Sequence, residues 1–137
     1  EVVLMWAIVL STMLLLTSWY GPGFDGNVTA NGEVYDQTAM TAAHRTVPFD
    51  TILEVRRGYR RAFVRINDRG PYSIEALREG KLAPHPSRDL DRSRAAFEYL
   101  APLDTGIMEV EVREVTLPLP LNVPPPEGRE YRANNGS

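Results

Sequence analysis

The stretch best suited to chemistry covers residues 65–72, where charged and polar residues follow an apolar strand pattern. The preceding run, Ala62–Ile66, alternates in a way that is typical of a β-strand. The sequence Asn-Asp-Arg-Gly-Pro then ends the strand, because Asn and Asp bond their own backbone, Gly permits positive φ and Pro lacks an N–H donor. Asp68 is thereby held at a strand end, where a rigid sheet can present a catalytic acid. For this segment alone, an Asx-turn in which Asp68 only caps a loop is the simpler interpretation.

Three other polar residues could contribute to the same chemistry. Glu33 follows an Asn-Gly turn signal, so it is either a solvated turn residue or a carboxylate held at the edge of a tight turn. His44 is either a structural histidine or a partner that fixes the protonation state of a carboxylate. Asp91 precedes a helical pattern, where Asp91 or Ser93 is the natural N-cap.

The elements that must position these residues are short. Strands are predicted over Thr51–Val55 and, from strict alternation of apolar and charged residues, over Gly106–Val115. Ser93–Leu100 has helical spacing and stops before a proline, and Ile74–Arg78 can form a helical turn within the long connection 73–87. Mostly short strands with Gly, Pro and Asn between them favour a small β-barrel, because closure removes the sheet edges.

The 137 residues fit one domain with extensions. We place the domain at 18–116, an apolar signal or membrane-anchor remnant at 1–17, and a Pro-rich, disordered tail at 117–137. The apolar run is short for a transmembrane helix, which needs about 20 residues. It suits the apolar region of a secretory signal, which would place the protein outside the cytoplasm and could associate it with a membrane. A buried first element of the domain is the alternative.

Composition excludes several functions. The formal net charge is −3 with no block of like charge, so there is no electrostatic footprint for nucleic acid. The sequence contains no Cys, which leaves no disulfide, no thiolate metal site and no support for lipoprotein anchoring. With two His residues, we expect neither a metal nor another cofactor. Nothing requires more than a monomer.

Several blocks of the sequence resemble the rare lipoprotein A (RlpA-like) family. They are Ser18–Gly21, Thr29–Asp36, Thr41–Phe49, Val64–Tyr72 and Asp91–Phe97. The resemblance implies a six-stranded double-psi β-barrel with one or two short helices. It also implies an endolytic lytic transglycosylase of the bacterial cell envelope, periplasmic or secreted. Such an enzyme cleaves MurNAc-GlcNAc bonds of peptidoglycan, preferably in peptide-free strands, and leaves 1,6-anhydro-MurNAc ends.

Residue by residue, the resemblance makes Asp68 the first choice for the general acid, with Glu33 and His44 lining the same groove. The predicted substrate-binding residues are Asp91, Trp19, Tyr20, Asn67, Arg69 and Tyr72. The three aromatic side chains could stack on sugar rings, although ordinary core or rim packing explains them equally well.

The chain departs from the family pattern at three places. Arg92 stands where the family usually has Leu, so a buried apolar anchor is lost or redirected. Asp50 replaces a usual Gly, and the connection 73–87 is longer than the family norm and could form a wall of the cleft.

One carboxyl group can perform both proton transfers of lytic cleavage, because it first protonates the leaving oxygen and then takes the proton of the C6 hydroxyl. We predict this role for Asp68. Arg65 and Arg69 lie close in sequence and would favour its ionised form, which opposes an acid role. Two other classes stay open. One is an expansin-like wall-binding module without catalysis, and the other is a hydrolase that pairs Asp68 with Asp91 or Glu33.

Overall fold

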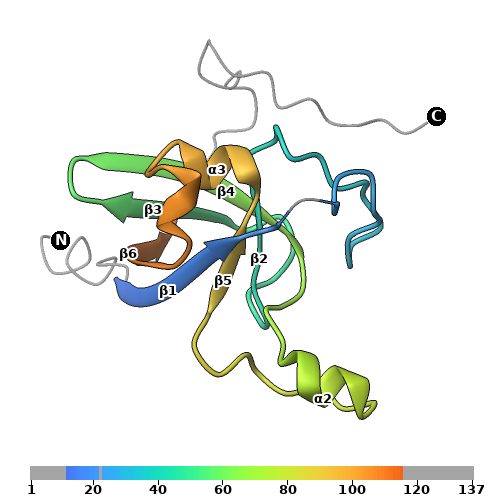
Figure 1. The fold of residues 1–137 in the computed structure, drawn as a ribbon. Coiled ribbons are helices and arrows are strands. Elements are labelled where there is room, and N and C mark those ends of the chain that lie inside the picture. Colours follow the sequence, from blue (N-terminus) through green and yellow to red (C-terminus); the bar gives the residue numbers. More distant parts are fainter. Residues whose placement is uncertain (1–11, 22, 116–137) are drawn as a thin grey trace, which may run out of the picture.

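A computed structural model describes residues 12–21 and 23–115, which form a closed barrel of six strands with two short helices (Figure 1). The strands are β1 (Met13–Trp19), β2 (Thr41–Ala43), β3 (Ile52–Arg57), β4 (Arg60–Asp68), β5 (Leu90–Arg92) and β6 (Met108–Glu114). The helices are α2 (Ile74–Arg78) and α3 (Arg94–Glu98), and a 3-10 turn, η1, covers Leu103–Thr105. The predicted fold class, a mainly β six-stranded barrel with one or two short helices, is confirmed.

The strand order around the barrel is β1-β5-β2-β4-β3-β6. Strands β1 and β5 are parallel, as are β2 and β4, and the remaining neighbours are antiparallel. Parallel neighbours need long crossover connections, so segments far apart in the chain lie side by side. Asp91 of β5 lies opposite both Ser18 of β1 and Ala43 of β2, and Ala43 also lies opposite Asp68 of β4. The topology therefore gathers candidate residues from four strands.

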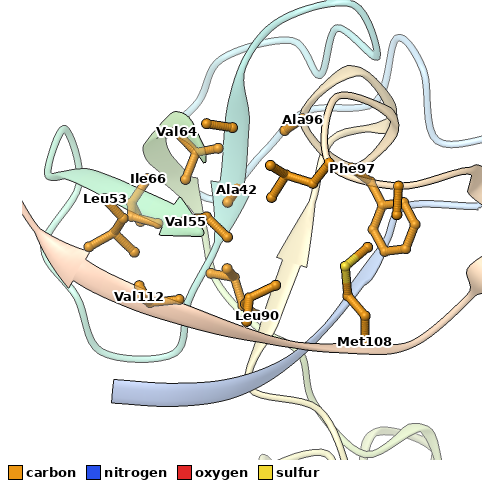
Figure 2. Packing of buried hydrophobic residues seen from close by; sticks show 14 residues of the cluster. Ala42, Leu53, Val55, Val64, Ile66, Leu90, Ala96, Phe97, Met108 and Val112 are labelled. Carbon is orange, nitrogen blue, oxygen red and sulfur yellow. The ribbon is translucent and has the colours of Figure 1, made fainter. Parts of the chain in front are cut away.

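The barrel interior is filled by apolar side chains at alternating strand positions. In β6 the side chains of Met108, Val110 and Val112 are buried, whereas Glu109 and Glu111 face solvent. This is the alternation predicted from the sequence. Figure 2 shows Phe97, which comes from α3, beside Met108 within the same cluster.

Helix α3 closes the core and begins where the sequence predicted. The hydroxyl of Ser93 accepts a hydrogen bond from the backbone N–H of Ala96 at 3.2 Å, so Ser93 is the N-cap. Asp91 lies in β5, and its interpretation as the cap is therefore wrong. The cap fixes the direction in which Phe97 enters the core, where its side chain is fully buried.

The first strand begins earlier than the predicted domain boundary. Met13–Thr17 pair with β6 and Thr17 also with β5, although we had placed these residues in an apolar leader. Residues 17–19 fit the short aromatic strand that the sequence predicts there, but the earlier part of β1 is not predicted, because Met13, Leu14 and Leu16 are apolar and yet exposed, which hides the alternation. The remainder of the predicted leader, residues 1–11, and the predicted tail lie outside the described residues. No helix in the described part of the chain is long and apolar enough to cross a membrane.

The long connection 73–87 projects from the barrel and carries α2 (Figure 1). The hydroxyl of Ser73 accepts a hydrogen bond from the backbone N–H of Ala76 at 3.3 Å and so caps the predicted helical turn. Tyr72 and Pro84 form an isolated antiparallel bridge that draws the two ends of the connection together.

Arg45 clamps both ends of this connection to the barrel. Its guanidinium donates hydrogen bonds to the carbonyl oxygens of Pro71 at 3.2 Å and Arg88 at 3.0 Å. It also forms an ion pair with the Asp89 carboxylate at 3.1 Å. The connection is therefore tied at its base by one side chain from the loop after β2.

Arg92 keeps its side chain in the core although it replaces an apolar residue. The side chain is fully buried, and its guanidinium donates to the Thr17 hydroxyl and to the Ala96 carbonyl, each at 3.1 Å. It also lies 4.7 Å from the centre of the Phe97 ring. Burial, followed by the charge of Arg57, lowers the pKa of Arg92 to about 9.

Asp50, the other single-residue departure, has a φ of 67°, in the left-handed region that favours glycine. An Asp tolerates this region better than most residues do. Its carboxylate also accepts a hydrogen bond from Arg65 at 2.9 Å. The backbone conformation at this position is thus one that a glycine would adopt without strain.

Candidate active site

The end of β4 is irregular at the position of the candidate acid. Opposite β2, Ala42 pairs with Ile66 and Ala43 with Asp68, so Asn67 is an extra residue in β4. Such a bulge changes the direction of the side chains next to it and is frequent beside active sites. Gly70 follows with a φ of 129°, which only glycine adopts readily, and the chain leaves the strand there.

The Asp68 carboxylate accepts three hydrogen bonds from separate parts of the fold. The Tyr20 hydroxyl donates to Oδ2 at 2.6 Å. The backbone N–H groups of Ala30 and Arg69 donate to Oδ1 at 2.9 and 2.8 Å. Asp68 is therefore fixed by the residue that follows β1, by the loop before β2 and by its own turn, which goes beyond an Asx-turn.

Neither neighbouring arginine directs its charge at Asp68. The Arg69 guanidinium donates to the carbonyl oxygens of His44 and Val47 at 3.2 and 2.8 Å, and it lies 3.8 Å from the centre of the Phe49 ring. The Arg65 guanidinium donates instead to the carboxylates of Glu33 and Asp50. The electrostatic conflict expected from the sequence is therefore reduced, because within the described residues Asp68 has no guanidinium partner.

Glu33 is held as an ionised carboxylate. Arg65 donates to both carboxylate oxygens at 2.7 Å, a bidentate ion pair. The side-chain amides of Asn67 and Asn31 donate to the same group at 3.2 and 3.0 Å. The hydrogen bonds from Arg65 are the largest cause that lowers the pKa of Glu33, to about 2, against the opposing effect of burial. Glu33 thus carries a negative charge at neutral pH.

His44 follows β2 and lies next to Asp68 through the backbone, since its N–H donates to the Asp68 carbonyl at 3.3 Å. Its ring Nδ1 accepts hydrogen bonds from the backbone N–H groups of Thr46 and Val47, both at 3.1 Å. Burial, followed by the charges of Arg45 and Arg69, lowers the pKa of His44. The ring is therefore neutral at pH 7, and because Nδ1 is an acceptor its proton is on Nε2.

Asp91 belongs to a separate polar cluster on β1 and β5. One of its carboxylate oxygens accepts a hydrogen bond from the Ser18 hydroxyl, and the same oxygen lies 3.6 Å from the Arg88 guanidinium. Arg88 also donates to the Ser18 hydroxyl at 2.8 Å. Burial and the hydrogen bond to Asp68 are the main causes that raise the pKa of Tyr20, and the charge of Asp91 adds to them, so the cluster lies close to the partner of Asp68.

The three aromatic candidates differ in their surroundings. Trp19 packs on the core against Phe97, at 6.5 Å between ring centres, and its indole N–H donates to the Leu103 carbonyl at 3.2 Å. This is core packing, because the Trp19 side chain lies against the apolar core cluster. Tyr20 uses its hydroxyl on Asp68, and Tyr72 lies at the base of the connection 73–87.

Sequence reasoning missed three contributors to the site. They are the Ala30 N–H that binds Asp68, the hydroxyl role of Tyr20, and the pairing of Arg65 with Glu33. The first two connect residues 38 and 48 positions apart in the chain, and no local pattern marks such contacts. The alternation in β4 did place Arg65 on the polar side of the strand, which was the available signal.

The hydrogen bonds and ring contacts of the candidate residues do not by themselves outline a cleft. A hollow of about 270 Å³ among the described residues is lined by none of the candidates and lies against Leu14, Arg56 and Glu109. The predicted groove stays a prediction. Within the described residues, no group of three His, Asp or Glu side chains could hold a metal ion.

Residues 12–112 match the family model described as "Lytic transglycolase", a double-psi β-barrel model. The chain belongs to the RlpA-like double-psi β-barrel family. The resemblance found in the sequence blocks is therefore confirmed.

Two curated relatives illustrate this family membership. The probable endolytic peptidoglycan transglycosylase RlpA of Treponema pallidum is 38% identical over 99 residues, which cover 71% of this chain and 27% of that protein. The endolytic peptidoglycan transglycosylase RlpA of Vibrio cholerae is 35% identical over 105 residues, which cover 75% of this chain and 35% of that protein. The chain thus spans about a third of the length of these relatives, or less.

Two solved structures share the fold at lower sequence identity. A Streptomyces papain inhibitor is 22% identical with a TM-score of 0.58, and the match covers 80% of this chain and 99% of the inhibitor. A mutant Clavibacter michiganensis expansin in complex with cellohexaose is 16% identical with a TM-score of 0.56, and the match covers 77% of this chain and 51% of the expansin. At these identities the two structures support the barrel fold, and no activity is inferred from them.

Proposed function

We propose that this RlpA-like domain is an endolytic peptidoglycan transglycosylase. It cleaves the bond between MurNAc and GlcNAc in glycan strands, preferably strands without stem peptides, and leaves 1,6-anhydro-MurNAc ends. The printed names of the curated relatives support this class of activity. The protein then acts as a monomer on peptidoglycan in the cell envelope, either in the periplasm or after secretion.

The proposal rests on one observation, which is that the Glu33 and Asp68 carboxylates have different hydrogen-bond partners. Glu33 is bound by the Arg65 guanidinium through both oxygens and stays ionised, so it cannot donate a proton. Asp68 is positioned by one hydroxyl and two backbone N–H groups, without a guanidinium. Of this pair, Asp68 is the carboxyl group that can exchange a proton during the reaction.

The reaction then needs one carboxyl group twice. Asp68 gives its proton to the glycosidic oxygen as the bond from that oxygen to C1 of MurNAc breaks. The C6 hydroxyl oxygen of the same sugar then forms a bond to C1, and its proton returns to Asp68. No water molecule is consumed. Asp68 ends in its starting form, so protons and electrons balance.

Glu33 and His44 act as supporting groups in this proposal. The fixed negative charge of Glu33 stabilises the positive charge that develops at C1 as the bond breaks. The neutral ring of His44 presents its Nε2–H as a donor for a sugar hydroxyl. Asn67 and Arg65 act through Glu33, because their side chains bind it.

A two-carboxylate hydrolase would use Glu33 or Asp91 beside Asp68. Glu33 is already engaged by Arg65, and Asp91 is engaged by Ser18 and Arg88. Activation of a water molecule by either group would have to compete with these partners. Lytic cleavage by Asp68 needs neither a second carboxylate nor an activated water molecule.

The test is digestion of peptide-free glycan strands, followed by mass spectrometry of the products. The wild-type chain is expected to produce anhydro ends, and Asp68→Asn is expected to produce none while it still binds the strands. Asp104→Asn, a change at an exposed carboxylate on η1, is the matched control and should digest normally. Reducing ends would instead indicate hydrolysis, and binding without any product would indicate an expansin-like module.

A further inference from the structure

The two oxygens of the Asp68 carboxylate have different kinds of partners. Oδ1 accepts two backbone N–H groups, from Ala30 and Arg69. A backbone N–H can only donate, so a proton on Oδ1 would face two donors. Oδ2 has the Tyr20 hydroxyl at 2.6 Å, and a hydroxyl can either donate or accept. The exchangeable proton of Asp68 is therefore best accommodated on Oδ2.

Tyr20 is itself held firmly in place. Its backbone N–H donates to the Arg92 carbonyl at 3.0 Å, which extends the pairing of β1 with β5. Its ring lies against Tyr35 and Phe24, with ring centres 4.7 and 5.7 Å apart. Such packing fixes the direction of the hydroxyl, because a tyrosine side chain has few rotatable bonds.

The Tyr20 hydroxyl also keeps its own proton. Burial, followed by the hydrogen bond to Asp68, raises the pKa of Tyr20 far above its ordinary value. The charge of Asp91 and the neighbouring Tyr35 act in the same direction. The phenol is thus available as a donor whenever Asp68 is ionised.

We propose that Tyr20 is the positioning residue of the catalytic carboxyl group, and that it selects Oδ2 of Asp68 as the oxygen that gives and retakes the proton. When Asp68 is ionised, the hydroxyl donates to Oδ2 and aims it. When Oδ2 carries the proton, the Tyr20 hydroxyl rotates so that its own hydrogen no longer points at Oδ2. The inference rests on the proposed function, and it gives Tyr20 a role other than the sugar stacking expected from the sequence.

The charged and titratable groups around this pair come from every neighbouring element. They are Asp91 on β5, Tyr35 and Glu33 on the loop before β2, His44 after β2, and Arg65 and Arg69 on and after β4. Tyr20 is the member of this set whose side chain touches the Asp68 carboxylate. Its removal therefore changes the protonation of that carboxylate most directly.

The experiment compares Tyr20→Phe with Tyr35→Phe in digestion of peptide-free glycan strands over a range of pH. A lost hydrogen bond to a charged group corresponds to roughly a tenfold to hundredfold effect. We expect kcat of Tyr20→Phe to fall by that factor with little change in KM. We also expect the alkaline limb of its pH profile to move to higher pH, because the ionised carboxylate has lost a donor. In the wild type the Tyr35 hydroxyl accepts a hydrogen bond from the Arg94 N–H and does not bind Asp68. Tyr35→Phe keeps the packed ring and removes only that hydroxyl, so its profile should stay unchanged.

A second variant should move the alkaline limb of the pH profile in the opposite direction. Incorporation of 3,5-difluorotyrosine at position 20 makes the phenol a stronger donor and should move the alkaline limb to lower pH. If the alkaline limb lies at the same pH in the wild type and in both Tyr20 variants while Asp68→Asn is inactive, the role of Tyr20 is overturned and the proposed function stands. Undiminished cleavage by Asp68→Asn would overturn the proposed function itself.

Discussion

Replacement of the buried Arg92 by methionine is expected to stabilise the barrel. The Arg92 guanidinium is fully buried, and its partners are the Thr17 hydroxyl, the Ala96 carbonyl and the sulfur of Met108, all uncharged. A buried charge without an opposite charge opposes folding, which is why the pKa of Arg92 is lowered to about 9. Methionine fills a similar length of core without a charge.

The expected gain follows from these contacts. The lowering of the pKa of Arg92 to about 9 corresponds to a penalty of roughly 5 kcal/mol for the buried charge. The variant loses two hydrogen bonds from a charged donor, worth about 1.5 kcal/mol each, and a contact with the Phe97 ring worth about 1–2 kcal/mol. We therefore expect the free energy of unfolding to rise by up to about 1 kcal/mol, in line with the neutral or stabilising effect of replacing buried ion pairs by apolar residues in other proteins.

Urea unfolding at pH 7 measures this change, with Arg94→Met as the matched control at an exposed position two residues away. The control should stay within about 0.5 kcal/mol of the wild type. Because the folded-state pKa of Arg92 is lowered to about 9, the unfolded chain binds more protons above about pH 9, and the penalty is relieved as the pH rises from there toward the ordinary pKa of arginine. The advantage of Arg92→Met should accordingly be constant at neutral pH and shrink above about pH 9. A less stable Arg92→Met beside a neutral control would refute the reasoning.

Three further changes test separate parts of the fold. Because Asp50 has a φ of 67°, Asp50→Gly should exceed Asp50→Ala in unfolding free energy by about 1–2 kcal/mol; equal values would show that the backbone is not strained. Glu33→Gln should lower stability at pH 7 and flatten its fall in acid, since the stability that follows from the lowered pKa of Glu33 is present above 4.5 and is lost toward about 2; an unchanged acid unfolding curve would contradict the ion pair with Arg65. Arg45→Met should speed amide hydrogen exchange in the connection 72–88 while exchange in the barrel strands stays constant; uniform exchange would show that Arg45 does not clamp the connection.

Local patterns in the sequence predicted much of the barrel. The alternation of β6, the helix α3 and the end of β4 at Asp68 all follow from residue types within a few positions of one another. The start of β1 could not be predicted in this way, because several of its outward-facing residues are apolar. Its place in the barrel depends on pairing with β5 and β6, which lie far along the chain.

The candidate site could likewise be predicted only in part. The sequence indicated Asp68, Glu33 and His44, but Tyr20 and Ala30, which bind Asp68, and Arg65, which binds Glu33, are distant from them in the chain. Arg65 was expected to act on Asp68, whereas the structure pairs it with Glu33. Such partner choices depend on the register of the strands and on the bulge at Asn67, which residue types alone do not define.

Cleavage of peptide-free glycan strands in water enriched in oxygen-18 tests the central claim most directly. If Asp68 returns the C6 oxygen of the sugar to its own C1, the wild-type products carry anhydro ends and contain no heavy oxygen, and Asp68→Asn yields no product. Heavy oxygen at the newly formed ends, or undiminished cleavage by Asp68→Asn, would contradict the account.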